Sequence, residues 1–205
     1  MPWPVGRATS NLLMSENDHP LTAAVASDRL NSPIVVVPLT PDWFIALRAC
    51  ATAVWHAAYD DLLPPGQVDH MLANRLRAEA LESYLAAADR WLDLALGADH
   101  SVIGYSSCRL VPEDGMLLLE QIYVHPDYWG GTAADALWSV VRQHACDSGC
   151  TTIQLRVNRG NSRAQRYYRK RGFTVTGEIV QDIGGGYVMD DYIFTAPVQT
   201  ERAPA

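Results

Sequence analysis

The sequence predicts one α+β domain with an α/β-like second half, and three observations support this fold class. The chain has 205 residues, of which 48% are apolar, so it can bury one substantial core. Strand and helix patterns alternate through the second half instead of forming separate blocks. A predicted strand also leads through Gly130–Gly131 into a predicted helix, which favours parallel pairing of the strands on either side of that helix.

The first half of the chain predicts a strand, two helical regions and three further strands. Ile34–Pro38 is a short apolar run typical of a buried strand. Pro41 and Asp42 open a helix whose apolar residues recur every three to four positions, and Leu62–Gly66 ends it. A second helical region is expected over residues 68–88. Strands are then expected at residues 91–96, 101–110 and 117–124.

The second half has a clearer alternation of elements. Apolar residues from Ala134 to Ala145 mark one face of a helix, which ends near Gly149. Polar and apolar residues alternate from 152 to 157, as in a strand with two different faces. Asn161 is placed to cap a further helix, which Gly172 ends. Two last strands are expected at residues 173–180 and 187–194.

The composition divides the chain into three regions. Residues 1–32 mix Pro, Ser, Asn and Asp without sustained periodicity and are predicted to be a mobile extension. Residues 33–196 are expected to form the single domain, and residues 197–205 a mobile tail. No apolar run approaches the roughly 18 residues of a membrane span, and the first residues lack a secretion-signal pattern, so a cytoplasmic location is expected.

Charge and cysteine content narrow the class of partner. The net charge of −7 argues against nucleic acid or an anionic membrane and favours cationic or amine partners. Four cysteines are too few for a disulfide framework at this length. His144, Cys146 and Cys150 form H-x-C-x3-C, but no second ligand pair of suitable spacing follows. We therefore predict reduced thiols and no metal site.

The stretch VHPDYWGGTAADALW, residues 124–138, has the elements of an anion site. The first N–H groups of a helix have no intrahelical acceptor, and the helix dipole places about half a positive charge there. Glycines let a ligand approach the backbone. The stretch is neither a P-loop nor a G-x-G-x-x-G fingerprint. Taken alone, Gly130–Gly131 is more typical of a plain turn.

In its context the stretch resembles motif A of the GNAT superfamily of acyl-CoA-dependent N-acyltransferases, V-x-P-x-x-[RQ]-G-x-G-x-[GA]. Trp129 stands where Arg or Gln is usual, and Thr132 replaces the second glycine. The matching residues are Val124, Pro126, Gly130 and Ala134.

Three other segments also resemble this family, so the resemblance covers about residues 34–195 in the family's order. Residues 161–173 are close to N-x-x-A-x-x-[FL]-Y-x-x-x-G-F. Val102–Tyr105 is similar to the v-x-G-[FY] strand, and Trp55–Pro64 to the helix and loop on the substrate side.

The resemblance implies a mixed, mostly antiparallel twisted sheet of six to seven strands with a central parallel pair, flanked by about four helices. It implies acetyl-CoA as acyl donor, an amine as acceptor and no metal; a homodimer is left open. Backbone N–H groups from about Trp129 to Ala134 would hold the CoA pyrophosphate. The residues expected to bind the donor are Ile122, Tyr123, Val124, Trp129, Gly130, Gly131, Thr132, Ala133, Ala134, Asn161, Arg163, Arg166 and Tyr168.

The implied reaction is direct attack of an amine on the thioester, in a ternary complex. An alkylammonium must first lose a proton, which costs roughly 4–5 kcal/mol at neutral pH. Glu120 is the leading base candidate. Many similar proteins carry this glutamate two residues earlier, at the position of Leu118, but alternation along a strand puts positions 118 and 120 on one face. A merely salt-bridged surface glutamate is the alternative.

The same resemblance assigns roles to two residues of the last predicted helix. Tyr168 would protonate the departing thiolate, although its spacing alone also fits a core aromatic. Asn161 would contact the pantetheine arm, or serve only as a helix cap. The backbone N–H near Val124 would polarise the thioester carbonyl.

Two charge patterns remain to be assigned. Seven of the sixteen cations lie between Arg156 and Arg171, in a stretch without an acid. They form either a solvated helix face or, through Arg163 or Arg166, a contact with the phosphates of CoA. The candidates for an acidic entrance for the amine are Tyr59, Asp60, Asp61, Asp190 and Asp191.

Three functions follow, of which an N-acetyltransferase acting on a small amine, a peptide N-terminus or a lysine is favoured. A non-catalytic acyl-CoA-binding regulatory module is kept open by the departures at Leu118, Trp129 and Thr132. A toxin-like aminoacyl-tRNA acetyltransferase is permitted by the basic stretch and disfavoured by the net charge.

Overall fold

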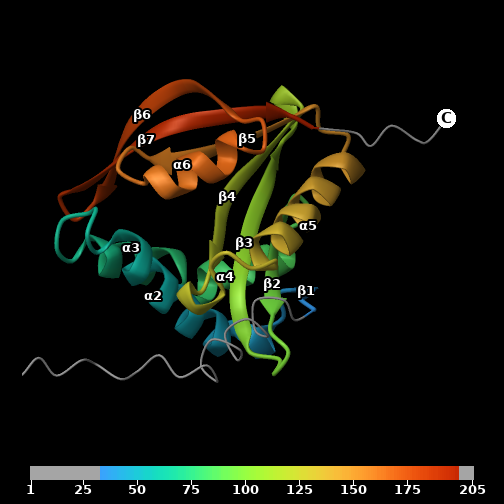
Figure 1. Ribbon diagram of the computed structural model, residues 1–205, viewed down its shortest axis with the longest axis vertical. Helices are drawn as coiled ribbons and strands as arrows, with labels where there is room; N and C mark the ends of the chain where they lie inside the picture. The colour runs from blue at the N-terminus through green and yellow to red at the C-terminus, as the bar shows by residue number, and fades with distance from the viewer. Residues whose placement is uncertain (1–32, 199–205) are drawn as a thin grey trace, which may run out of the picture.

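The computed structural model describes residues 33–198, which form a single seven-stranded sheet with helices on both faces (Figure 1). The strands are β1 (Val35–Pro38), β2 (Arg90–Leu96), β3 (Val102–Val111), β4 (Met116–Val124), β5 (Thr152–Asn158), β6 (Thr174–Gly184) and β7 (Tyr187–Pro197). The α-helices are α2 (Phe44–Tyr59), α3 (Gln67–Arg75), α4 (Ala78–Ala86), α5 (Ala133–Asp147) and α6 (Ser162–Arg169). The 3-10 turns are η1 (Pro41–Trp43), η2 (Pro112–Asp114) and η3 (Pro126–Tyr128).

The strand order is β1-β2-β3-β4-β5-β7-β6, and every neighbouring pair is antiparallel except β4 and β5. These two parallel strands are joined by α5, as the sequence predicts. The predicted mixed, mostly antiparallel sheet of six to seven strands with a central parallel pair is therefore confirmed.

Two cores cover opposite faces of the sheet. One packs α2, α3 and α4 against β2 and β3, and its largest fully buried side chains include Trp55 and Tyr105. The other packs α5 and α6 against β4, β5 and β7, around Leu137, Leu155 and Phe194. Helices of 8 to 16 residues are only marginally stable in isolation, so these helices depend on the packing of their apolar faces against the sheet.

The structure differs from the predicted elements at two connections. The helical region expected at 68–88 is two helices, because Leu76 and Arg77 leave the helical conformation. The hairpin before β7 has a shorter loop than the predicted turn at 182–186. Gly185 and Gly186, with φ of 66° and 81°, make the two-residue turn that matches strand twist, and β6 runs to Gly184.

The hairpin of β6 and β7 is fixed to the segment around α3, which brings two remote parts of the chain together (Figure 1). The buried Gln67 amide donates to the Val188 carbonyl at 2.8 Å. The Tyr187 hydroxyl donates to the Pro65 carbonyl at 3.2 Å, and a ring nitrogen of His70 contacts the Ile183 carbonyl at 2.9 Å.

The predicted extension at residues 1–32 and most of the predicted tail, residues 199–205, lie outside the described residues. Strand β7 runs through Pro197, one residue beyond the predicted end of the domain. None of the helices at residues 33–198 is long and apolar enough to cross a membrane.

Gly104 lets β3 and β4 approach closely beside the end of β4. A Cβ at Gly104 would lie 2.6 Å from the Tyr123 carbonyl oxygen, whereas a Cβ at Gly177 would meet only the Ile193 side chain, at 3.4 Å. We expect Gly104→Ala to lower the free energy of unfolding by about 1–3 kcal/mol, as overpacking does, and Gly177→Ala to change it little. Urea unfolding of both variants measures this, and equal stability would contradict the close approach.

Candidate functional site

The centre of the site is the place where the two parallel strands separate. β4 and β5 are paired only from Met116 to Leu119 and from Thr152 to Leu155. Beyond Leu119, β4 continues to Val124, and β3 is its only partner strand among residues 33–198. A cavity of about 420 Å³ lies in the resulting cleft, between the outer parts of β4 and β5 and the helices α2 and α6.

The pattern of hydrogen bonds between β3 and β4 leaves some N–H and C=O groups of β4 pointing into this cleft. The His125 N–H donates to the Ile103 carbonyl at 2.7 Å, so Gly104 and Val124 form the next, non-hydrogen-bonded pair of the antiparallel ladder. The N–H and C=O of Val124 therefore point away from β3, toward the side that β5 has left. The same holds for Ile122, two residues earlier.

A β-bulge places Glu120 at the start of the cleft. Gln121 is paired with Ser107 and Leu119 with Cys108, which leaves Glu120 as the extra residue of β4. Its carboxylate faces α4: one oxygen accepts from the Tyr84 hydroxyl at 2.9 Å, and the other lies 3.3 Å from Nε of Arg109. Glu120 lines the cavity with both carboxylate oxygens engaged.

The turn before α5 provides a short run of backbone donors. Gly130 has φ of 86°, which requires glycine, and a Cβ there would meet no atom within 4 Å. The first helical bonds come from the N–H groups of Asp135 and Ala136 to the Thr132 carbonyl. Thr132 has φ of −86°, which any residue adopts, so the usual glycine is not needed here for backbone freedom.

Within the predicted run from Trp129 to Ala134, two N–H groups have acceptors in the turn itself. Trp129 N–H donates to Pro126 and Gly131 N–H to Tyr128. The N–H groups of Thr132, Ala133 and Ala134 precede the first intrahelical bond and suit an anion better.

Trp129 acts through its side chain. Its indole N–H donates to the Val124 carbonyl at 2.7 Å, so the ring lies against the cleft edge of β4. The guanidinium of Arg163, on α6, stacks over this ring at 3.3 Å from the centroid. Trp129 and Arg163 both line the cavity and connect its two walls.

Helix α6 provides the wall opposite β4. Asn161 is its N-cap, because its side-chain oxygen accepts from the Ala164 N–H at 3.0 Å, and it also lines the cavity. Tyr168 is 7% exposed and packs on Phe173 and Phe194. Burial raises the pKa of Tyr168 well above its ordinary value, so the phenol keeps its proton at neutral pH.

Most of the predicted site residues are brought together. Arg166 is the exception: its guanidinium donates to the Ser162 hydroxyl at 3.2 Å and does not line the cavity. Gly130, Gly131, Thr132 and Ala133 form the turn next to the cavity. The predicted residues that line the cavity are Glu120, Ile122, Tyr123, Val124, Trp129, Ala134, Asn161, Arg163 and Tyr168.

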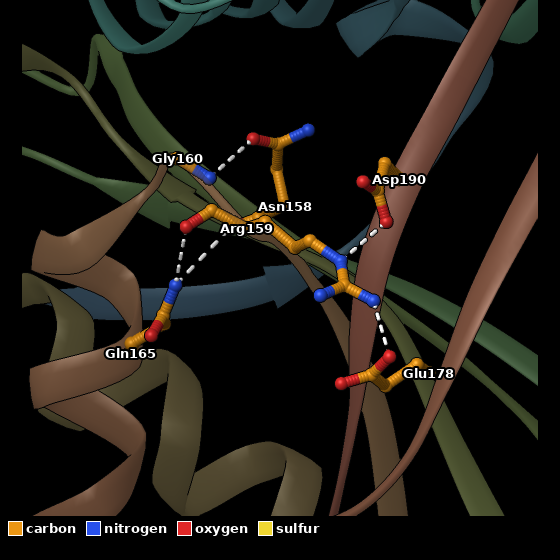
Figure 2. Close-up of polar contacts among 6 residues, drawn as sticks. All are labelled: Asn158, Arg159, Gly160, Gln165, Glu178 and Asp190. Atoms are coloured by element: carbon orange, nitrogen blue, oxygen red, sulfur yellow. Dashed lines mark hydrogen bonds and ion pairs between the residues drawn. The ribbon is translucent and has the colours of Figure 1, made fainter.

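Two cations of the basic stretch are paired with acids from distant elements. Figure 2 shows Arg159 between two acids from other strands, Asp190 of β7 and Glu178 of β6, each at 2.5 Å. Arg171 pairs with Asp135 at the start of α5, and Arg156 donates to Gln181 at 2.7 Å. All of these partners lie outside the basic stretch, so the pairing is not visible from the stretch itself.

The loop before α6 is fixed by amide side chains (Figure 2). The Gln165 amide donates to the Arg159 carbonyl at 2.9 Å, and the Asn158 oxygen accepts from the Gly160 N–H at 2.9 Å. The loop that positions Asn161 is therefore tied to both α6 and β5.

His144, the first residue of the H-x-C-x3-C pattern, contacts side chains from β2. It contacts Asp93 at 2.9 Å and stacks on Trp91 at 4.6 Å between ring centroids. Over residues 33–198, no group of three or more His, Cys, Asp or Glu side chains is arranged to hold a metal ion.

Gln121 is a site residue that the sequence did not single out. Its side-chain oxygen accepts from the Ser107 hydroxyl at 3.0 Å. Gln121 lines the same cavity, and its buried amide nitrogen has no hydrogen-bond partner among residues 33–198. Only the bulge, which redirects β4 at Glu120, reveals this placement, and no sequence pattern signals it.

The comparisons with known proteins agree with this geometry. Residues 48–173 match the model of the acetyltransferase (GNAT) family. A protein of Mycobacterium tuberculosis, named an uncharacterized N-acetyltransferase, is 29% identical over 147 residues, which are 72% of this chain and 92% of that protein.

Solved structures share the fold at low sequence identity. The PaiA N-acetyltransferase of Thermoplasma acidophilum, in complex with coenzyme A, has a TM-score of 0.66 at 19% identity, over 80% of this chain and 99% of that one. YncA of Salmonella typhimurium, with acetyl-CoA, has a TM-score of 0.59 at 18% identity, over 85% and 99% of the two chains.

The side chain of Asn161 has two distinct polar groups: its oxygen caps α6, and its amide nitrogen takes no part in the cap. We expect Asn161→Ala to lower the free energy of unfolding by about 1 kcal/mol through loss of the cap, and Asn161→Asp to retain it. If the amide also contacts the donor, Asn161→Asp will weaken CoA binding without loss of stability. Thermal unfolding and CoA titration of both variants measure this. Equal unfolding of the two would contradict the capping role.

Proposed function

The chain belongs to the acetyltransferase (GNAT) family, and we propose that it transfers an acetyl group from acetyl-CoA to an amine by direct attack in a ternary complex. The observation that carries this proposal is the cleft edge of β4, where Val124 turns its N–H toward a cavity that also contains Tyr168. CoA and acetyl-CoA are present in the PaiA and YncA structures, which have the same fold.

The described residues fit the donor along its length. The N–H groups of Thr132, Ala133 and Ala134, with open space at Gly130, suit the pyrophosphate. The outward N–H and C=O of Ile122 suit an amide of the pantetheine arm. The donor supplies an activated thioester. The N–H of Val124 polarises its carbonyl, and the buried cleft strengthens that interaction by excluding water.

The proton steps are assigned to two side chains. Tyr168 donates a hydrogen bond, and then a proton, to the departing thiolate, and its buried phenol is protonated at neutral pH. Glu120 accepts the proton of the amine through a water relay, because Arg109 and Tyr84 engage both of its oxygens.

The sequence leaves two other functions open. An aminoacyl-tRNA substrate is disfavoured by the net charge of −7 and by the pairing of Arg159 and Arg171 of the basic stretch with acids. A non-catalytic acyl-CoA-binding module shares the donor site, so turnover separates it from the enzyme.

The reaction and the Tyr168 assignment are tested by thiol release from acetyl-CoA with a panel of amines and peptides. Tyr168→Phe retains the ring that packs on Phe173 and Phe194, so it will fold and bind acetyl-CoA with unchanged KM while kcat falls about 100-fold. Tyr192→Phe, a phenol outside the cavity lining, is the matched control.

The outcomes of this assay discriminate among the proposals. Equal kcat in Tyr168→Phe and the wild type removes Tyr168 from proton transfer. A higher melting temperature with acetyl-CoA, but no thiol release with any acceptor, favours the non-catalytic module. No change in melting temperature contradicts donor binding itself.

The structure separates the two arginines that the sequence left as alternatives. We expect Arg163→Ala to weaken CoA binding about tenfold and to reduce its salt dependence, because Arg163 lines the cavity next to the phosphate turn. We expect Arg166→Ala to bind as the wild type does. Calorimetric titration at several salt concentrations measures both. Unchanged affinity in Arg163→Ala, or equal losses in the two variants, would remove Arg163 from phosphate binding.

A further inference from the structure

Two charged side chains, Glu120 and Arg156, line the cavity from the face of the sheet that carries α2, α3 and α4. Leu119 and Leu155, the last residues at which β4 and β5 are paired, both pack into the core beneath α5 and α6. Side chains alternate along a strand, so the next residues, Glu120 and Arg156, turn to the opposite face. The contact of Glu120 with Tyr84 of α4 agrees with this direction.

These two side chains stand on neighbouring strands but are not paired with each other. Paired strands lie about 4.8 Å apart, and β4 and β5 begin to separate at this point. The Glu120 carboxylate contacts Arg109 of β3 and Tyr84 of α4. The guanidinium of Arg156 turns the other way, to Gln181 of β6. A negative and a positive group therefore stand on the two sides of the place where the cleft begins.

The charge of Arg156 is available to a ligand. Its side chain is exposed, and none of the ion pairs within residues 33–198 includes it. Burial raises the pKa of Asp191, on the neighbouring strand β7, to about 6, and Arg156 opposes this rise, so its charge also acts on that buried carboxylate. Arg163, which lines the cavity as well, is instead stacked on Trp129 beside the phosphate turn.

The remaining edge of this guanidinium has the geometry of a carboxylate-binding group. Its Nη1 donates to the neutral amide of Gln181 at 2.7 Å, and no hydrogen bond from its Nε or Nη2 is found in the described part of the chain. Nε and Nη2 present two parallel N–H groups, which match the two oxygens of a carboxylate. Because Arg156 lines the cavity and is exposed, a carboxylate can reach it from solvent without displacing an acid.

We propose that Arg156 is the specificity residue for the acceptor, that it binds a carboxylate of the acceptor, and that the acceptor is a small α-amino acid. This inference rests on the proposed acetyl transfer and names its acceptor class. The amine lies toward Glu120, which takes its proton through water, while the carboxylate of the same molecule lies on Arg156. The amine forms the new C–N bond, the C–S bond of the thioester breaks, and the carboxylate of the acceptor is unchanged.

The test compares three variants of the full chain. Arg156→Gln removes the charge, and Arg156→Lys keeps the charge but not the planar fork. Arg166→Gln is the matched control, because it removes the same charge from an exposed arginine of α6 that bonds to Ser162 and does not line the cavity. The acceptors are a panel of L-α-amino acids, each with its α-carboxamide, which lacks the negative charge. Thiol release gives KM and kcat for each acceptor, and CoA titration gives donor affinity.

We expect the wild type to have a lower KM for free amino acids than for their carboxamides. Arg156→Gln will raise the KM of the best amino acid at least about tenfold, since it loses hydrogen bonds between charged groups. The KM of the matching carboxamide and the affinity for CoA will not change. Arg156→Lys will recover part of the loss, and Arg166→Gln will behave as the wild type does.

Four outcomes overturn the proposal. The first is a wild-type protein that acetylates carboxamides, or amines without a carboxylate, as well as it acetylates free amino acids. The second is an equal rise in KM for the free acid and its carboxamide, which indicates a structural role, and the third is no rise. The fourth is weaker CoA binding by Arg156→Gln, which places Arg156 in the donor site. Absence of thiol release with every acceptor, or of donor binding, contradicts the proposed function instead.

Discussion

The divergence of β4 from β5 after Leu119 and Leu155 is the constraint on which the rest of the site depends. Paired strands satisfy each other's backbone groups, so strands that separate leave N–H and C=O groups without ladder partners. The Trp129 indole covers one of these groups, the Val124 carbonyl. The cavity lies against the remaining edge. A ligand arm that carries its own amide donors and acceptors complements such an edge better than water does in a buried space.

The width of the cleft is set by contacts between α6 and the segment that follows β4. The Tyr167 hydroxyl donates to the Ala134 carbonyl at 3.1 Å, and Arg171 pairs with Asp135. Both contacts connect the far end of α6 to the first turn of α5, while Arg159 fixes the strand before α6 to β6 and β7. Side chains that a local view of the sequence assigns to solvent therefore hold the two walls at a fixed separation.

The sequence was sufficient for the parallel pair, for the helix α5 that joins its strands and for the glycine turn before α5, because these depend on local periodicity and glycine placement. It was not sufficient for Gln121. The placement of Gln121 results from the bulge at Glu120. The partners of Arg159 and Arg171 are equally non-local. These side-chain placements and pairings depend on the register between strands that are distant in the sequence, and a single sequence contains no local signal for that register.

The two departures from the family's phosphate motif have different physical consequences. Thr132 has a backbone conformation open to any residue, so replacing glycine there does not strain the turn. Trp129 replaces a polar or cationic side chain with an apolar ring, which removes charge from the turn. The same ring carries the guanidinium of Arg163 on its face, so α6 returns a cation to nearly the same place. Because the indole is also hydrogen-bonded to Val124, that cation is held on the cleft edge of β4. With Trp129 in the turn, the positive charge beside the turn therefore comes from Arg163 of α6 instead of from the turn itself.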